Sequence, residues 1–316
     1  MQRHGDKTTE AHVVMFSGCR DDQVSADVCS TKNFGLPADA GPGGAGGACT
    51  NSMLKFLLDE HGDDTWVSLL AGMQTFLKQS KYTQVPQLSA GNDSFDPNSK
   101  FGLMNPNPNG RTKALFVGIN YVGHDAGVLD GCHNDVESMM KFVESQGFDR
   151  DEFAVLRDNG EDTPPTTENI RENLRALVAD AQPGDSLFFH YSGHGINVMD
   201  EDGDERDGQD EALAPMDYNT EDGELIRDDE IFQIINDSLP EGASLVAVLD
   251  CCHSATLLDL PYTCVLTEEQ YQALAEDHAR KTAASNRNRM AELAVKTCFS
   301  ISKFLFEKYA AKQGSR

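Results

Sequence analysis

SLFFHYSGHG, residues 186–195, and LVAVLDCCHS, residues 245–254, are the two stretches that decide the fold. Each begins with a short run of mostly apolar residues, which is typical of a strand buried on both faces. Similar runs lie at residues 114–119 and 153–156. These four stretches predict a buried sheet.

Helical patterns separate these runs. Apolar residues recur at helical spacing over residues 136–143, 170–178 and 231–235, and Gly147 is placed to end the first of these helices. Strands that alternate with helices predict an α/β fold with a mainly parallel central sheet and helices on both faces. In such sheets functional residues collect at the carboxyl ends of the strands.

Composition narrows the class of partner. The 316-residue chain has 52 acidic residues against 26 Lys and Arg, a formal net charge of −26. Phosphate binding needs clustered cations, so we expect no nucleic-acid partner, whereas hard cations or basic substrates suit the acids. No apolar run approaches the roughly 20 residues that cross a bilayer, so we expect no membrane partner.

Eight cysteines are present and none forms a Cys-x-x-Cys pair, which argues against a zinc or thioredoxin-like site. Behind the charges of residues 1–6 there is no apolar stretch of the secretory type. We therefore expect reduced thiols and a cytoplasmic location. Disulfides are the alternative that an even count of cysteines leaves open.

A segment rich in Asn, Pro, Gly and Ser divides the chain. We expect a small domain at residues 1–90, an exposed linker at 91–112 and a catalytic domain at 113–265. We expect the small domain to contain a short apolar strand, a flexible loop of Gly, Ala and Pro at residues 41–47, and two helical stretches after it. Residues 266–316 lack strand signals and predict helices packed on the outside.

The two deciding stretches end in groups that can perform acyl transfer. His194 lies between two glycines just past one strand, and Cys252 lies just past another. A histidine beside a thiol can activate it for attack on a carbonyl, and the N–H groups of Gly195 and Cys252 can bind the oxyanion that develops. Taken singly, the cysteine is more typical of a buried small residue and the histidine of a solvated loop. Their occurrence at two strand ends favours a site.

The motifs HYSGHG at residues 190–195 and DCCHS at residues 250–254 together resemble those of the metacaspases, the caspase-related cysteine peptidases. Residues 17–27 and 86–89 resemble the small domain of that family, which usually follows the catalytic domain. Here it precedes it, as in the permuted type III metacaspases. The resemblance implies a caspase-like sandwich, a cysteine endopeptidase that cuts after Arg or Lys, a monomer, and a link to programmed cell death.

Carried over by position, the resemblance makes His194 the catalytic histidine and Cys252 the nucleophile. It also implies an acidic specificity pocket lined by Cys132, Asp135, Ser192 and Asp250. Partly desolvated carboxylates select guanidinium or ammonium groups by charge-assisted hydrogen bonds. As an alternative, Asp135 caps the helix in which it lies. Asp21 and Asp27 are expected to approach the site from the small domain.

A run of acidic residues at 200–211 half fits an EF-hand, but Glu205 stands where that loop requires Gly. The resemblance implies a different Ca²⁺ site, formed by Asp210, Asp228, Asp229 and Asp259. Calcium bound there would draw separate loops together and shape the active site. Capping of the following helix remains an alternative role for Asp228 and Asp229.

Two other functions compete with this hypothesis. The first is a calcium-responsive pseudo-peptidase or scaffold that binds basic segments without cutting them. The second is a different Cys/His transferase on a similar sheet. The presence of both His194 and Cys252 argues against the first, and the acidic pocket positions argue against the second.

Overall fold

The computed structural model describes most of the chain. The residues described are 1–5, 7–19, 27–28, 45–58, 64–107, 109–125, 127–200, 208–252, 254 and 257–283.

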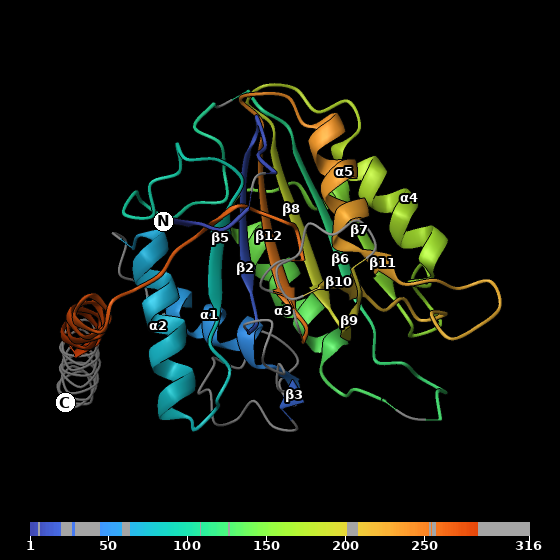
Figure 1. The fold of residues 1–316 in the computed structure, drawn as a ribbon, viewed down its shortest axis with the longest axis horizontal. Coiled ribbons are helices and arrows are strands. Elements are labelled where there is room, and N and C mark those ends of the chain that lie inside the picture. Colours follow the sequence, from blue (N-terminus) through green and yellow to red (C-terminus); the bar gives the residue numbers. More distant parts are fainter. Residues whose placement is uncertain are drawn as a thin grey trace, which may run out of the picture.

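An eight-stranded sheet forms the centre of the molecule (Figure 1). In spatial order its strands are β1 (Gln2–Arg3), β13 (Tyr262–Thr263), β5 (Gln87–Ala90), β2 (His12–Ser17), β12 (Ser244–Asp250), β8 (Ser186–Ser192), β6 (Thr112–Gly118) and β7 (Phe153–Arg157). The five strands from β2 to β7 are parallel, and β5, β13 and β1 continue the sheet in antiparallel pairing. The expected α/β, caspase-like fold is confirmed.

Helices cover both faces of this sheet. They are α1 (Ala48–Leu58), α2 (Trp66–Gln79), α3 (Cys132–Ser145), α4 (Thr167–Val178) and α5 (Asp228–Ser238), with a short 3-10 turn at Arg150–Glu152. Side chains alternate along β2, so that Val13 and Met15 join the core under α4 and α5, while Val14 and Phe16 join the core under α1, α2 and α3.

The N-terminal segment is part of the same sheet as the rest of the chain. β2 pairs in parallel with β12 from His12↔Ser244 to Ser17↔Leu249, and β5 pairs with both β2 and β13. Figure 1 shows β2, in blue, and β12, in orange, side by side. The site at the end of β12 is therefore built beside residues from the start of the chain.

Two small sheets lie outside the central one. β9 (Gly195–Met199), β10 (Gln209–Leu213) and β11 (Ile226–Arg227) form one, and β3 (Asp27–Val28) and β4 (Gly46–Gly47) form the other. The β9–β10 pair was not expected, because both strands are short and the sequence of β10, Gln-Asp-Glu-Ala-Leu, is mostly polar.

The expectation of an exposed linker is wrong at Gly91, Phe95 and Leu103, which are buried. Phe95 and Leu103 are 5% and 3% exposed, and the Trp66 ring packs edge-on against Phe95 and Phe101 at centroid distances of 5.6 and 4.8 Å. Burial of these aromatic rings anchors the segment to α2.

The glycine-rich loop is also not free where it is described, since Gly46 and Gly47 are buried in β4. Residues 41–44 of that loop lie outside the described residues.

A helix at residues 268–283 packs on the outside, as expected, with the His278 ring stacked on Phe56 of α1 at 4.5 Å. The rest of the C-terminal segment lies outside the described residues. Within the described part of the chain, no helix has both the length and the apolar character that crossing a bilayer requires.

Candidate active site

The two deciding stretches end side by side. In the parallel pairing of β8 with β12, Ser192 lies opposite Asp250, and His194 and Cys252 each follow two residues later. A Cβ atom added to Gly195 would lie 2.0 Å from the Cys252 carbonyl oxygen, so only glycine allows this approach. The structure therefore brings the His194 turn against the Cys252 turn at one edge of the sheet.

The imidazole of His194 is held from two sides. Its Nε2 lies 2.6 Å from the carbonyl oxygen of Gly127, and because a carbonyl only accepts, Nε2 carries the proton. Nδ1 is then the basic nitrogen. The Tyr121 ring stacks on the imidazole at a centroid distance of 4.5 Å, and the backbone N–H of His194 donates to the Tyr121 hydroxyl at 2.8 Å. Tyr121 and Gly127 were missed in the sequence, although Tyr121 lies just past β6.

Cys251 and Cys252 differ in accessibility. Cys251 is 1% exposed, and burial first, then nearby thiols and Asp250, raise the pKa of its thiol. Cys252 is half-buried. The Ser254 hydroxyl fixes this turn, because it donates to the Cys251 carbonyl at 3.0 Å and accepts the Gly18 N–H at 3.1 Å. The six cysteines in the described residues are free thiols.

Asp135 and Asp250, here called the pocket pair, are buried beside this edge at 1% and 5% exposure. Oδ2 of Asp135 accepts the Ser192 hydroxyl at 2.9 Å and the Gly47 N–H at 2.7 Å, and Oδ1 accepts the Asn51 side-chain amide at 3.1 Å. Oδ2 of Asp250 accepts the Thr50 N–H at 2.7 Å. The donors Gly47, Thr50 and Asn51 were missed in the sequence, because they lie far from the pair along the chain.

Asp250 takes the place of a missing cap on α1. A Cβ atom built on Gly47, the residue before the helix, would lie 2.2 Å from Oδ2 of Asp250. The carboxylate thus occupies the space of an N-cap side chain and accepts an N–H of the first helical turn, as a cap would. The N-terminus of α1 favours negative charge at this point.

The alternative role for Asp135, as a cap on its own helix, does not match its hydrogen bonds to α1 and β8. The residue before α3, Gly131, makes no side-chain cap, and the Cys132 N–H donates to the side chain of Asn120 at 3.0 Å. Cys132 itself is 3% exposed. Asp21 lies outside the described residues, and of Asp27 only the backbone, in β3, is described.

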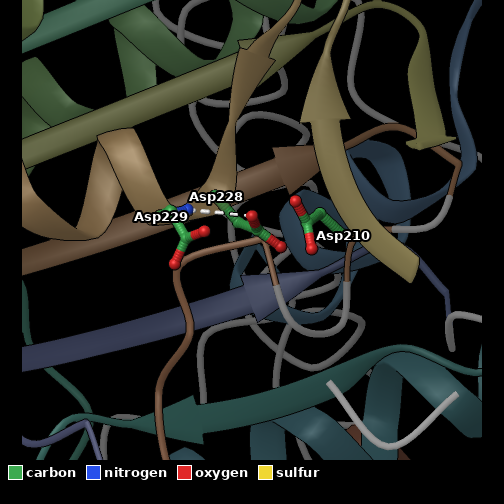
Figure 2. Close-up of side chains that lie close together, drawn as sticks. All are labelled: Asp210, Asp228 and Asp229. Carbon is green, nitrogen blue, oxygen red and sulfur yellow. Dashed lines mark hydrogen bonds between the residues drawn. The ribbon is translucent and has the colours of Figure 1, made fainter. Parts of the chain in front are cut away.

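A second acidic group lies at the start of α5 (Figure 2). Asp210, Asp228 and Asp229 each offer one carboxylate oxygen within 4.8 Å of the others. Asp228 accepts the N–H of Glu211 at 2.9 Å and that of Asp229 at 2.8 Å, so part of its role is local. All the possible ligand atoms are carboxylate oxygens, which hard cations prefer, so these residues fit a calcium ion.

Two basic side chains reach this group. Lys7 donates to Asp259 at 2.8 Å and also contacts Asp229, which joins Asp259 to the other three acids. We call the four carboxylates Asp210, Asp228, Asp229 and Asp259 the α5 cluster. Arg227 pairs with Asp210. Neither cation was identified in the sequence, and residues 201–207 of the acidic run lie outside the described residues.

Charge in the α5 cluster remains costly despite these cations. Burial, and then the charge of Asp259, raise the pKa of Asp228 to about 7. Burial also raises the pKa of Asp210, although Arg227 opposes the shift. A group of acids that resists ionisation without a cation is a group that a divalent cation stabilises.

The comparisons with known proteins agree with this arrangement. A model described as "Metacaspase, peptidase C14 domain" matches residues 112–261, and a model described as "Caspase domain" matches residues 1–94. Metacaspase III c of Phaeodactylum tricornutum is 45% identical over 259 residues, which cover 80% of this chain and 75% of that protein.

Fungal relatives match a smaller part. Metacaspase-1A of Neurospora crassa is 42% identical over 184 residues, 57% of this chain and 40% of that protein. Metacaspase-1 of Sclerotinia sclerotiorum is 47% identical over 159 residues, 49% of this chain and 36% of that protein. The match over most of the diatom protein, with the caspase segment first and the peptidase C14 segment second, means that the chain belongs to the metacaspase family of cysteine endopeptidases, in the permuted order of type III.

Proposed function

We propose that this metacaspase is a calcium-dependent endopeptidase that cleaves its protein substrates after Arg or Lys. In this proposal Cys252 is the nucleophile and His194 the base, with Asp135 and Asp250 as the carboxylates that select a basic side chain. The α5 cluster holds the calcium ion. Each part of the proposal has its own support.

The dyad is supported by the approach of the two turns and by the tautomer of His194. With Nε2–H donating a hydrogen bond to the Gly127 carbonyl, the unprotonated Nδ1 is able to take the thiol proton of Cys252. The thiolate attacks the scissile carbonyl, and the N–H groups of Gly195 and Cys252 bind the oxyanion. The amine product leaves with a proton from His194, and water then hydrolyses the acyl-enzyme.

The preference for Arg or Lys is carried by one observation, the pocket pair. Two carboxylates stand beside Ser192 and the Cys252 turn. Asp135 accepts hydrogen bonds from the Gly47 N–H and the Ser192 hydroxyl, and Asp250 accepts one from the Thr50 N–H. Hydrogen bonds of this kind favour the ionised form of a carboxylate and fix its direction, and an ionised carboxylate pairs strongly with a guanidinium or ammonium group.

The calcium requirement is supported by the α5 cluster. Asp210 comes from β10, which pairs with the strand that begins directly after His194, and Ala212 of β10 lies opposite Ile196. The carboxylates Asp228 and Asp229 come from the start of α5. A cation that binds all three would fix β10, and through it β9 and the His194 turn.

The test uses fluorogenic peptides that differ only in the residue before the cut bond: Arg, Lys, and the uncharged citrulline. We expect Arg and Lys peptides to be cleaved in calcium and not in chelator, and the citrulline peptide to be cleaved poorly in both. The Cys252→Ala variant is the control for contaminating peptidases. Equal rates for Arg and citrulline would exclude the basic preference, and equal rates with chelator would exclude the calcium requirement.

A further inference from the structure

Tyr121 has an unusual backbone conformation for its residue type. Its φ of +55° lies in the left-handed region, which is unfavourable for a residue with a Cβ atom. Tyr121 is only 1% exposed. The residues other than glycine that usually adopt this conformation have short polar side chains, unlike the bulky ring of tyrosine. Such strain persists where the surroundings fix it, and it concentrates at functional sites.

The carboxylate of Asp158 fixes this conformation from both sides. Its Oδ1 accepts the N–H of Asn120 at 2.9 Å and its Oδ2 accepts the N–H of Val122 at 2.8 Å, so it binds the two residues that flank Tyr121. His133 of α3 contacts the same carboxylate at 2.6 Å. Burial by itself would raise the pKa of Asp158, but the hydrogen bonds from His133, Val122 and Asn120 outweigh it and hold that pKa below its ordinary value.

Tyr121 makes two contacts with His194. Its ring lies against the imidazole, with an angle of 30° between the planes. Its hydroxyl accepts the His194 N–H at 2.8 Å and donates to the Ala214 carbonyl at 2.7 Å. The ring therefore sets the plane of the imidazole, and the hydroxyl sets the backbone that carries it.

The same loop supplies the other contact of His194. Gly127, whose carbonyl accepts Nε2–H, lies six residues after Tyr121 in the connection from β6 to α3. Asn120 ties the far end of this connection, because its carbonyl accepts the Leu129 N–H at 3.0 Å and its side chain accepts the Cys132 N–H at 3.0 Å. Asp158 holds Asn120, so one carboxylate supports both contacts of the imidazole.

We propose that Asp158 and Tyr121 are positioning residues for His194, which together fix the plane and the tautomer of its imidazole. Neither residue is assigned contact with the substrate. The inference rests on the proposed pairing of His194 with Cys252, but not on the preference for Arg or Lys or on calcium. Its test therefore avoids peptide substrates.

The test measures how fast iodoacetamide alkylates Cys252 in the full-length protein between pH 5 and 9, with labelling at Cys252 followed by mass spectrometry. Only the thiolate displaces iodide, so the rate reports how well His194 withdraws the thiol proton. We expect Asp158→Asn to slow alkylation at pH 6 about tenfold, because a small displacement of a catalytic group is costly. Tyr121→Phe keeps the ring and should slow alkylation severalfold.

Two matched controls separate positioning from a general loss of structure. Asp185, at the opposite end of β8, accepts the N–H groups of Arg111 and Gln182 in the same way, at 2.8 and 2.9 Å. Asp185→Asn should lower thermal stability as Asp158→Asn does and leave the alkylation profile unchanged. Tyr218 packs edge-on against Tyr121 at 6.2 Å, and Tyr218→Phe should also leave the profile unchanged.

A second readout is the ¹⁵N NMR signal of the His194 ring, assigned by its loss in His194→Ala. We expect the Nε2–H tautomer in the parent protein and a mixture of tautomers in Asp158→Asn. If both variants keep the parent profile and the parent tautomer, the inference is wrong while the dyad stands. If His194→Ala itself leaves the alkylation profile unchanged, the dyad is wrong and the inference falls with it.

Discussion

The pocket pair and the α5 cluster are two groups of carboxylates that differ in the groups that bind them. Both are groups of neighbouring carboxylates, which are buried in the pair and range from buried to half-buried in the cluster. Asp135 accepts hydrogen bonds from Gly47 and Asn51, and Asp250 accepts one from the Thr50 N–H, all at the start of α1. The α5 cluster is reached by the cations of Lys7 and Arg227. In the pair, the donors belong to the backbone and to short, buried side chains. In the cluster, they belong to two long side chains that are about 30% exposed.

This difference determines how each group responds to its surroundings. Backbone donors stay in place, so the pocket pair keeps its geometry whatever the solution contains. Lysine and arginine side chains have many rotamers, and ordering them costs entropy, so another cation can displace them. We therefore expect the pair to act as a fixed recognition element and the cluster to act as a responsive one.

The largest expected effect is the loss of activity when one charge of the pocket pair is removed. Asp135→Asn keeps the shape of the side chain but removes the partner of a substrate cation, which costs 2–5 kcal/mol when the pairing is buried. We expect kcat/KM for an Arg peptide to fall by about 100-fold or more. Calorimetry should show unchanged calcium binding. A parallel loss of calcium binding would contradict the independence of the two groups.

The next effect tests the fixed geometry of the pair directly. Gly47→Ala would place a methyl group against the carboxylate of Asp250, and overpacking of this kind costs about 1–3 kcal/mol. We expect a lower unfolding temperature and a higher KM for basic peptides. Gly102→Ala is the matched control, because a Cβ atom there has nothing within 4 Å. Equal stability of the two variants would mean that Asp250 moves freely.

The sequence predicts one part of this comparison well. Parallel strands with buried faces are long apolar runs, so β6, β8 and β12 are visible in the sequence, and the residues just past β8 and β12 are natural candidates for chemistry. What the sequence does not reveal is which donors meet those residues. Gly47 lies far along the chain from Asp250, and a glycine before a helix gives no sign that a distant carboxylate will cap it.

The α5 cluster was equally hard to complete from the sequence. Lys7 is a single cation near the N-terminus, and its sequence gives no sign of a partner. Its segment lies beside Asp259 because β1 pairs with β13 and the His4 N–H donates to the Pro261 carbonyl at 2.7 Å. The buried linker residues Phe95 and Leu103 were missed for a related reason. Apolar residues scattered among many polar ones show no periodicity, and the Phe95 ring is buried against Trp66 of α2.

A smaller effect, about tenfold in affinity, is expected from Lys7. Lys7→Met removes the ammonium group that a divalent cation must displace or tolerate, so the calcium Kd should fall about tenfold, which is 1.4 kcal/mol. In chelator the same variant should unfold at a lower temperature, because the carboxylates lose a counter-ion. Lys100→Met changes the net charge equally at an exposed site and should do neither. Weaker calcium binding in Lys7→Met would show that Lys7 supports the site instead of competing for it.

The smallest effect is on the pH dependence of the free energy of unfolding, which the two regions should change in opposite directions. His190, behind the pocket pair, is fully buried beside Thr50, and burial lowers its pKa to about 3. In the unfolded chain it takes up a proton near pH 6.5, so its contribution to stability is present above that pH and is lost as the pH falls toward 3. Asp228 behaves in the opposite way. Its pKa of about 7 in the folded, calcium-free protein lies above the unfolded value, so its contribution is present below about pH 4 and is lost as the pH rises to 7.

Between pH 4 and 6.5 these two slopes oppose each other, and each amounts to about 1 kcal/mol per pH unit. Denaturant unfolding in chelator should therefore give a steeper loss of stability on acidification for Asp228→Asn than for the parent protein. His190→Gln should give the reverse, a shallower loss of stability on acidification than in the parent protein. The difference between each variant and the parent isolates the single group from the remaining titrating residues. If stability changed with pH equally in the two variants, Asp228 and His190 would not have the opposite effects expected of them.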